Sequence, residues 1–484
     1  MRALIIGIIL CFIIGTADIY NLVKIQGSYM TIDFTTGFAI FFIFFITLFN
    51  YLFKKIFKKE GLKISELIVI YIMMIVSCSI PTMGLTLYLI PLIAGIKYYS
   101  NPQNEWDNLI IPNVKKSLIV QDENAIKWFF EGLPKGQNIP WISWIKPISL
   151  WIPLILSLYL AMIFIMVILH KQWSENERLN YPMTKAPIEL INSENNNIFK
   201  NGLFWFGFLI PFIFGLINGL HFYFPNFPQA QLVKNIPIFR RTLGLSFRIS
   251  FPMIGFTYFV SLPLAFSLWF FCLLTTIEQG FFNIVGLTFV YSSDVRTFVM
   301  ASVANGLKIA EEIKGKKKII FWAIIISIII TLFSSIWATI ILCYKYGGIN
   351  ANQWFFVNGP QYPLKYIADK IKNPKGPDWL YIGFTGIGAV FTIFLLLMRL
   401  KFLNFPFHPL GFAFSTIMMT NALWFSIFIT WLIKSMILRY GGAKIYDKFK
   451  NLFIGLIIGQ FVISGLFLIV DFFTQRTGNT IFWA

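Results

Sequence analysis

The most polar stretch of the chain, SENERLNYPMTKAPIELINSENNN at residues 174–197, combines acids, bases and two prolines. Its side chains Glu177, Arg178 and Glu189 are of the types that bind a substrate carboxylate or ammonium, or a coupling proton or sodium ion. Pro182, after Tyr181, interrupts a helix in its first turn and leaves backbone amides that can face an anionic group. The alternative interpretation is a solvated cytoplasmic loop, whose charges contact only water.

Glu189 is the strongest single candidate, because the sequence PIELI places its carboxylate at an apolar helix start. We expect Tyr181, Pro182 and Glu189 to lie where a cytoplasmic loop re-enters the membrane. The helix that follows Pro187 should turn toward the protein interior, where a carboxylate needs a partner or a cavity. Glu189 is therefore predicted to contact the substrate or the coupling ion.

Further polar candidates lie in or beside apolar runs, where an ionisable group costs ~2.5 to 3.5 kcal/mol. They are Asn218, His221, Glu278, Asp294, Arg296 and His408. Each also has a simpler interpretation. His221 can be interfacial, Glu278 can reach water, and Asp294 can pair locally with Arg296. His408, between two prolines, marks a break in a helix.

The sequence contains no motif for a metal site, for nucleotide binding or for a serine hydrolase. The four cysteines and three histidines show no CxxC, HxxH or HExxH spacing, so we expect no metal site and no cofactor. The nucleotide-binding patterns GxGxxG and GxxxxGK[ST] and the serine-hydrolase pattern GxSxG are also absent. No catalytic residue is predicted, because no acid and base are convincingly paired.

The composition is that of a polytopic membrane protein. Of 484 residues, 57% are hydrophobic and 13% are charged, and the mean hydropathy is +0.71. A bilayer crossing needs about 20 apolar residues. Runs of this kind occupy residues 3–20, 36–53, 62–80, 149–169, 203–220, 249–274, 319–342, 380–398, 409–433 and 452–472. The first run leads through Asp18 into a short polar connection, and Asp471 should lie at the interface.

Helix breakers interrupt several of these runs. Discontinuous helices are expected around Pro81 to Pro91, Ser292 to Asp294 and Phe405 to Pro409. The predicted fold is an all-α, polytopic integral membrane helix bundle of about 10–12 transmembrane segments, with one extracytoplasmic loop subdomain. The GLIIG sequence at Gly455 to Gly459 indicates close helix packing, either within the chain or in a homo-oligomer.

The net charge of +19 indicates a lipid partner rather than nucleic acid, because the lysines gather at span ends. The clusters at 54–63 and 314–318 should be cytoplasmic and residues 100–147 outside. We expect a multi-pass protein of the cell (plasma or inner) membrane, with a single integral membrane domain over residues 1–484. Its regions are a proline-broken cytoplasmic loop at 170–200 and a pair of membrane segments at 401–484.

The extracytoplasmic loop, residues 98–147, is too long for a simple connection and too short for a core of its own. We expect it to cap the helices at the membrane interface; the alternative is a mobile gate over a substrate path. Six rings should give it an aromatic surface. They are Trp106, Trp128, Phe129, Phe130, Trp141 and Trp144.

The segments KISELIVIYIMM, FFEGLP, HKQWSENERLNYPMTKAPIEL, FHPLGFAFS and WLIKSMILRYGGAKIYDK resemble an uncharacterised family of prokaryotic polytopic membrane proteins, along essentially the whole chain. That family is distantly similar to the oligopeptide transporter superfamily, which includes the yellow-stripe metal-chelate carriers. Leu179, Tyr181, Pro182 and Ala186 are similar in order and spacing to a re-entry motif of those carriers. Met183, Thr184 and Lys185 depart from its Gly, Thr and Ala.

Two hypotheses of function follow. The first is an ion-coupled secondary transporter of a small polar solute, driven by H⁺ or Na⁺, which the broken helices and sparse buried charges favour. The second is a membrane-embedded enzyme or assembly factor that acts on lipid-linked or envelope material. An acid and a base paired near one membrane face would favour the second.

Overall fold

The computed structural model describes residues 2–31, 36–177, 179–193, 198–238, 243–276, 299–312, 317–373, 376, 379–402, 405–415 and 417–482. It confirms the all-α fold, with one short hairpin as the exception. Within the described residues, 7 helical stretches are long and apolar enough to cross a membrane. They are Arg2–Ile25, Gly37–Phe57, Trp141–Asn176, Gly202–Tyr223, Lys318–Tyr346, Ile382–Lys401 and Thr420–Thr474. The chain is thus a multi-pass membrane protein.

The chain folds into two compact units. The first holds residues 1–179, 284–374 and 464–483, and the second holds 180–283 and 375–463. The helices of the first unit are α1 (Arg2–Tyr20), α2 (Gly37–Phe57), α3 (Ile64–Cys78), α4 (Thr86–Tyr98), α5 (Trp106–Leu109), α6 (Glu123–Glu131), α7 (Trp141–Lys171), α14 (Val299–Ala310), α15 (Lys317–Tyr346) and α16 (Gly359–Lys372).

The second unit contains the remaining helices and the hairpin. They are α8 (Pro182–Ile191), α10 (Gly202–Tyr223), β1 (Val233–Ile238), β2 (Leu243–Arg248), α11 (Phe251–Phe259), α12 (Leu262–Thr276), α17 (Trp379–Lys401), α18 (Pro409–Ala413), α19 (Met418–Met436) and most of α20 (Gly442–Thr474). The strands pair antiparallel, with Val233 opposite Arg248. Sequence analysis does not predict this hairpin.

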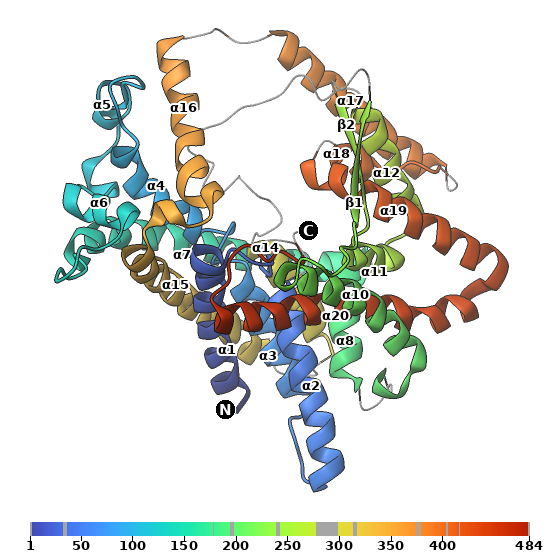
Figure 1. Cartoon of the computed structure of the whole chain (residues 1–484). Helices are drawn as coiled ribbons and strands as arrows, with labels where there is room; N and C mark the ends of the chain where they lie inside the picture. Colours follow the sequence, from blue (N-terminus) through green and yellow to red (C-terminus); the bar gives the residue numbers. More distant parts are fainter. Residues whose placement is uncertain are drawn as a thin grey trace. The chain divides into compact units, whose positions relative to one another are not determined.

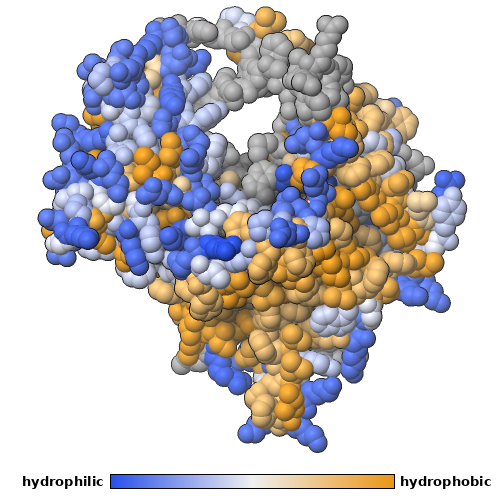
Figure 2. Space-filling model, viewed as in Figure 1, coloured by the Kyte–Doolittle hydropathy of each residue, from blue (hydrophilic) through white to orange (hydrophobic). Residues whose placement is uncertain are grey.

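Helix α3 forms the centre of the first unit. Every residue from Leu67 to Cys78 is buried, and α3 packs against α1, α14 and α15 (Figure 1). A helix that is apolar all round is expected to be covered on every side. The surface of α2 is largely hydrophobic and ends in a hydrophilic tip (Figure 2). That pattern is expected of a helix whose flank faces lipid and whose end reaches water.

The predicted break near Pro81 is confirmed. Helix α3 ends at Cys78 and α4 begins at Thr86, although Pro91 lies within α4 without ending it. The break near Phe405 to Pro409 is also present, because α17 ends at Lys401 and α18 begins at Pro409. The segment Ser292 to Asp294 lies outside the described residues.

Two predicted spans are not continuous helices. The run 249–274 is divided into α11 and α12 around Val260, just before Pro263. The run 409–433 is divided into the short α18 and the longer α19. Pro263 lacks an amide hydrogen and lies in the first turn of α12, so it accounts for the first division. The second division falls after Ala413, beyond Pro409. The count of 249–274 as one span was therefore wrong.

The loop over residues 98–147 is not an aromatic surface. Trp106, Phe129, Phe130 and Trp144 are at most 1% exposed, so the sequence prediction was wrong for these rings. Phe130 stacks on Tyr98 with centroids 4.2 Å apart, and the Trp144 indole donates to the Tyr344 hydroxyl at 2.8 Å. The rings give α6 and the start of α7 a small core against α4 and α15.

Candidate functional site

The carboxylate of Asp18 is the most unusual polar group of the first unit. It lies on α1, in a stretch long enough to cross the membrane, and Asp18 is only 1% exposed. Ionisable groups at such positions are costly and usually functional. Sequence analysis placed Asp18 in a polar connection, whereas the structure buries it among apolar helices.

One carboxylate oxygen of Asp18 is satisfied and the other is not. The Thr31 hydroxyl donates to Oδ2, and the hydroxyls of Thr31 and Thr82 are 2.9 Å apart. Oδ1 has no hydrogen-bond partner within the described part of the chain, and no basic side chain there forms an ion pair with Asp18. A buried carboxylate without a countercharge must carry a proton or bind a cation.

The interruption between α3 and α4 supplies Thr82. At this point the chain turns back so tightly that a Cβ atom on Gly84 would lie 1.8 Å from the Ser79 carbonyl oxygen, so only glycine fits. The amides of Thr86 and Leu87 donate to the carbonyls of Ile80 and Pro81 at 3.1 and 3.2 Å. Interrupted helices of this kind present backbone oxygens and hydroxyls to ions in carriers.

Hydroxyl groups continue from this interruption along α15. Ser77 and Thr331 are 2.6 Å apart, and Thr86 and Ser335 are 2.8 Å apart. All four are fully buried. Positions 331 and 335 are four residues apart and therefore share one face of α15. The three helices α3, α4 and α15 thus meet through hydroxyl pairs in an otherwise apolar core.

A second buried carboxylate, Asp471, has a different environment. The Asn479 amide donates to both of its oxygens at 3.0 and 3.1 Å, and Asp471 is fully buried. Nearby in sequence, the amides of Ile481 and Phe482 donate to the Ser28 hydroxyl at 2.9 and 3.1 Å. Asp471 therefore holds the C-terminal segment in place, while Asp18 keeps an oxygen available.

The donor set around Asp18 suits a proton or an alkali cation. The carboxylate of Asp18 and the hydroxyls of Thr31 and Thr82 are all oxygen ligands, which hard cations prefer. Within the residues that the structure describes, no group of three or more His, Cys, Asp and Glu could hold a metal ion. We define the Asp18 site as Asp18, Thr31 and Thr82.

The predicted candidates around the two prolines lie elsewhere, in and before α8. Helix α8 begins at Pro182, with Tyr181 as its N-cap, and Pro187 lies inside it. The prediction that the helix starts after Pro187 was wrong, because a proline fits the first turn and Pro182 comes first. Glu177 is exposed and accepts from the Gln172 amide at 3.3 Å.

The predicted partner for Glu189 is present. Its carboxylate forms an ion pair with Lys450 of α20, and the Glu189 side chain is 13% exposed. The apolar face of α8, with Leu190 and Ile191, is buried as expected. Because Lys450 neutralises Glu189, the partly buried carboxylate has its countercharge within the protein and needs no substrate or ion to supply one.

Asn218 and His221 hold the loop that follows α10. The Asn218 amide donates to the Ala230 carbonyl at 3.1 Å and accepts from the Ala230 amide at 2.8 Å. His221 Nδ1 lies 2.6 Å from the Phe227 carbonyl. His221 therefore contacts the backbone of the loop that follows its own helix. Arg178, Glu278, Asp294 and Arg296 lie outside the described residues.

His408 caps the N-terminus of α18. Its Nδ1 accepts from the Leu410 amide at 3.1 Å, and its own amide donates to the Ser267 hydroxyl at 2.6 Å. Burial lowers the pKa of His408 to about 4, and the positive charge of Arg399 acts in the same direction. The imidazole is therefore neutral near pH 7, which leaves Nδ1 able to accept a hydrogen bond.

This cap predicts a loss of stability in mild acid. Because the pKa of His408 is lower in the folded state than its ordinary 6.5, its contribution is complete above pH 6.5 and declines as the pH falls to about 4. We expect a decline of about 1 to 2 kcal/mol after allowance for half-burial. His408→Asn keeps a capping acceptor without the titration. Thermal unfolding between pH 4 and 7 should show a smaller decline in this variant, and equal declines would contradict the assignment.

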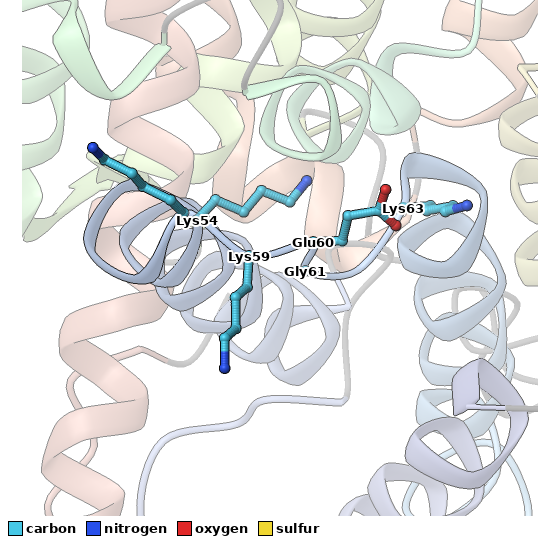
Figure 3. Close-up of a pocket in the computed structure, with 6 residues that line it drawn as sticks. Lys54, Lys59, Glu60, Gly61 and Lys63 are labelled. Carbon is cyan, nitrogen blue, oxygen red and sulfur yellow. The ribbon is translucent and has the colours of Figure 1, made fainter.

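The lysine-rich turn between α2 and α3 surrounds a hollow of about 550 Å³. Its lining residues are Lys54, Lys58, Lys59, Glu60, Gly61 and Lys63. The side chain of Lys59 points away from Glu60 and Lys63 (Figure 3). Since the ammonium groups do not converge, this turn suits diffuse contact with anionic headgroups rather than one bound ligand.

The side of the membrane on which this turn lies can be tested by cysteine labelling. The natural cysteines are all buried, so labelling of the parent protein should be low. We expect a membrane-impermeant maleimide to modify Gln137→Cys in intact cells and to modify Lys59→Cys only after permeabilisation. Modification of Lys59→Cys in intact cells would reverse the orientation. The parent protein, labelled under both conditions, is the control.

Comparison with known proteins gives one match. A family model described as "Family of unknown function (DUF6785)" matches residues 1–293 and 285–483. No curated protein and no solved structure matches the chain. The match covers nearly the whole sequence and assigns no role to the residues described above.

Proposed function

The chain belongs to the DUF6785 family of unknown function, and we propose that it is an ion-coupled secondary transporter of a small polar solute. The observation that carries this proposal is the free oxygen of Asp18 beside the interruption of α3 and α4. In carriers, interrupted helices bind the coupling ion near the middle of the membrane. A proton or Na⁺ at Asp18 would remove the uncompensated charge.

Binding of that ion would also change the local packing. Thr31 contacts Asp18, and Thr82 of the α3–α4 turn contacts Thr31, so a cation held by all three would draw this turn toward α1. Loss of the ion leaves a charged carboxylate that favours water and a looser arrangement. Two arrangements that differ in ion affinity are the requirement for coupling. The likeness of LNYPMTKAPIELI to oligopeptide and yellow-stripe carriers supports the same class of function.

Uptake into proteoliposomes tests this function and identifies the solute in the same experiment. Vesicles with the purified protein receive a small-molecule extract outside, under an inward Na⁺ or proton gradient, and their contents are identified by mass spectrometry. We expect at least one polar solute to accumulate over protein-free vesicles, and to stop accumulating when an ionophore dissipates the gradient. No accumulation by folded protein would contradict the proposal.

A second candidate function, a membrane-embedded enzyme, is favoured by one cluster in the first unit. His170 lies 3.0 Å from Glu311, and Lys308 lies 2.7 Å from both Glu311 and the Ser174 hydroxyl. Although partial burial opposes ionisation, hydrogen bonds from Lys308 and Ser174 lower the pKa of Glu311. The Ser174 hydroxyl donates to Glu311, which could take its proton as the serine oxygen attacks the ester carbonyl of a lipid-linked substrate and the alcohol leaves with a proton. Labelling of Ser174 by a fluorophosphonate, absent in Ser174→Ala, would favour this function; no labelling would exclude a nucleophilic serine.

A further inference from the structure

An apolar groove of about 610 Å³ lies in the first unit between α1, α2, α15 and the end of α20. Its walls are mainly aromatic and aliphatic and include Phe38, Phe41, Trp337, Leu468 and Phe472. All four helices belong to stretches long enough to cross a membrane. A groove at that depth is filled by hydrocarbon rather than by water, and its volume is in the range of small-molecule sites.

Polar groups mark one end of the groove. Thr16 and Tyr20 in the last turns of α1, and Asn21 directly after it, are part of its lining. The Tyr20 hydroxyl and the Gln475 amide are hydrogen bonded at 3.2 Å. Tyr346 and Lys345, at the end of α15, lie close enough to Tyr20 to affect its hydroxyl electrostatically. The groove is therefore amphipathic, with a long apolar part and a short polar end.

Two lysines concentrate positive charge at this end. The ammonium of Lys24 lies 4.9 Å from the centre of the Tyr346 ring, and that of Lys345 lies 5.2 Å from the same ring. Within the described residues, neither lysine forms an ion pair with an acid. The ring attracts each cation but carries no net charge to balance them. Two positive charges beside one apolar groove complement an amphiphile with an acidic head.

We propose that this groove binds an anionic phospholipid from the bilayer, with an acyl chain between α1, α2, α15 and α20 and its phosphate beside Lys24 and Lys345. The inference is independent of the transport function and does not involve Asp18, which does not line the groove. Each lysine near a bilayer surface strengthens the attraction to an acidic headgroup, and the apolar walls retain the chain.

Lipid titration of the purified full-length protein, followed by native mass spectrometry, tests the proposal. Phosphatidylglycerol and phosphatidylcholine with the same acyl chains separate the effect of charge from the effect of the chain. We expect phosphatidylglycerol to bind about tenfold more tightly than phosphatidylcholine, because only phosphatidylglycerol has a headgroup with a net negative charge for the two lysines to attract. Glycerol 3-phosphate, which lacks the chains, should not bind. Equal affinity for both lipids, or binding of glycerol 3-phosphate alone, would overturn the proposal.

Three variants assign the effect to this groove. Lys24→Gln with Lys345→Gln should remove the preference for phosphatidylglycerol. Ala17→Phe, which places a ring in the groove, should weaken binding of both lipids. The matched control is Lys115→Gln with Lys370→Gln, which removes two exposed lysines away from the groove, one of them over the Tyr366 ring. A lost preference in the control, or a retained one in the first variant, would show that the lipid binds elsewhere.

Discussion

Replacement of Asp18 with asparagine should abolish the stabilisation of the protein by its coupling ion. The wild-type protein should melt at a higher temperature when Na⁺ replaces a large organic cation at constant ionic strength, or when the pH is lowered. A ligand at 100 times its dissociation constant contributes about 2.7 kcal/mol. Asparagine keeps the shape of Asp18 and the contact with Thr31 but cannot take a proton or balance a cation.

The matched control for this experiment is Asp471→Asn. Asp471 is equally buried, but Asn479 already satisfies both of its oxygens. Its replacement should lower the melting temperature at every ion concentration and leave the response to Na⁺ or pH unchanged. If the melting temperature of Asp18→Asn still rises with Na⁺ or at low pH, the assignment of the Asp18 site is contradicted. It is also contradicted if this rise is lost in Asp471→Asn alone.

Gly455→Leu should cause the largest loss of folding stability. A Cβ atom on Gly455 would lie 2.2 Å from the Phe204 carbonyl oxygen of α10, and one on Gly459 would lie 2.2 Å from that of Phe208. Backbone atoms cannot yield as a flexible side chain does, so α10 and α20 must separate. We expect the free energy of unfolding to fall by about 3 kcal/mol or more.

Helix α17 offers the control for this substitution. Nothing lies within 4 Å of a Cβ atom on Gly383. Only 6% of the membrane-crossing part of α17 is buried. Gly383→Leu should therefore be nearly neutral, since leucine also favours a helix over glycine. Denaturation of both variants in mild detergent compares them directly. Equal stabilities would mean that α20 does not pack against α10 at the distance described.

For these glycines, the sequence predicts that helices pack closely but does not predict which helices pack together. The GLIIG spacing predicts close helix packing, and the structure identifies α10 of the same chain as the partner. The sequence alone leaves an intramolecular contact and a homo-oligomer equally possible. Spacing is a local property, whereas the identity of the partner depends on how the chain folds back over two hundred residues.

The candidate site was harder to predict for the same reason. Sequence analysis favoured Glu189, because its carboxylate stands at an apolar helix start, and Lys450 neutralises it in the structure. Asp18 stands almost alone in an apolar run, and Thr31 and Thr82 become its neighbours only through the fold. One signal was available: an aspartate within a run long enough to cross the membrane. The break at Pro81 was predicted correctly, because proline acts on its own helix.

Ion flux into proteoliposomes tests the central claim most directly. Lumenal pH and ²²Na⁺ uptake are measured in vesicles that contain the wild-type protein, Asp18→Asn or Glu189→Gln, with the small-molecule extract present. We predict that one of the two ions enters with the wild-type protein and with Glu189→Gln, and that neither enters with Asp18→Asn. Equal flux through the wild-type protein and Asp18→Asn would contradict a coupling role for Asp18, whatever solute the protein carries.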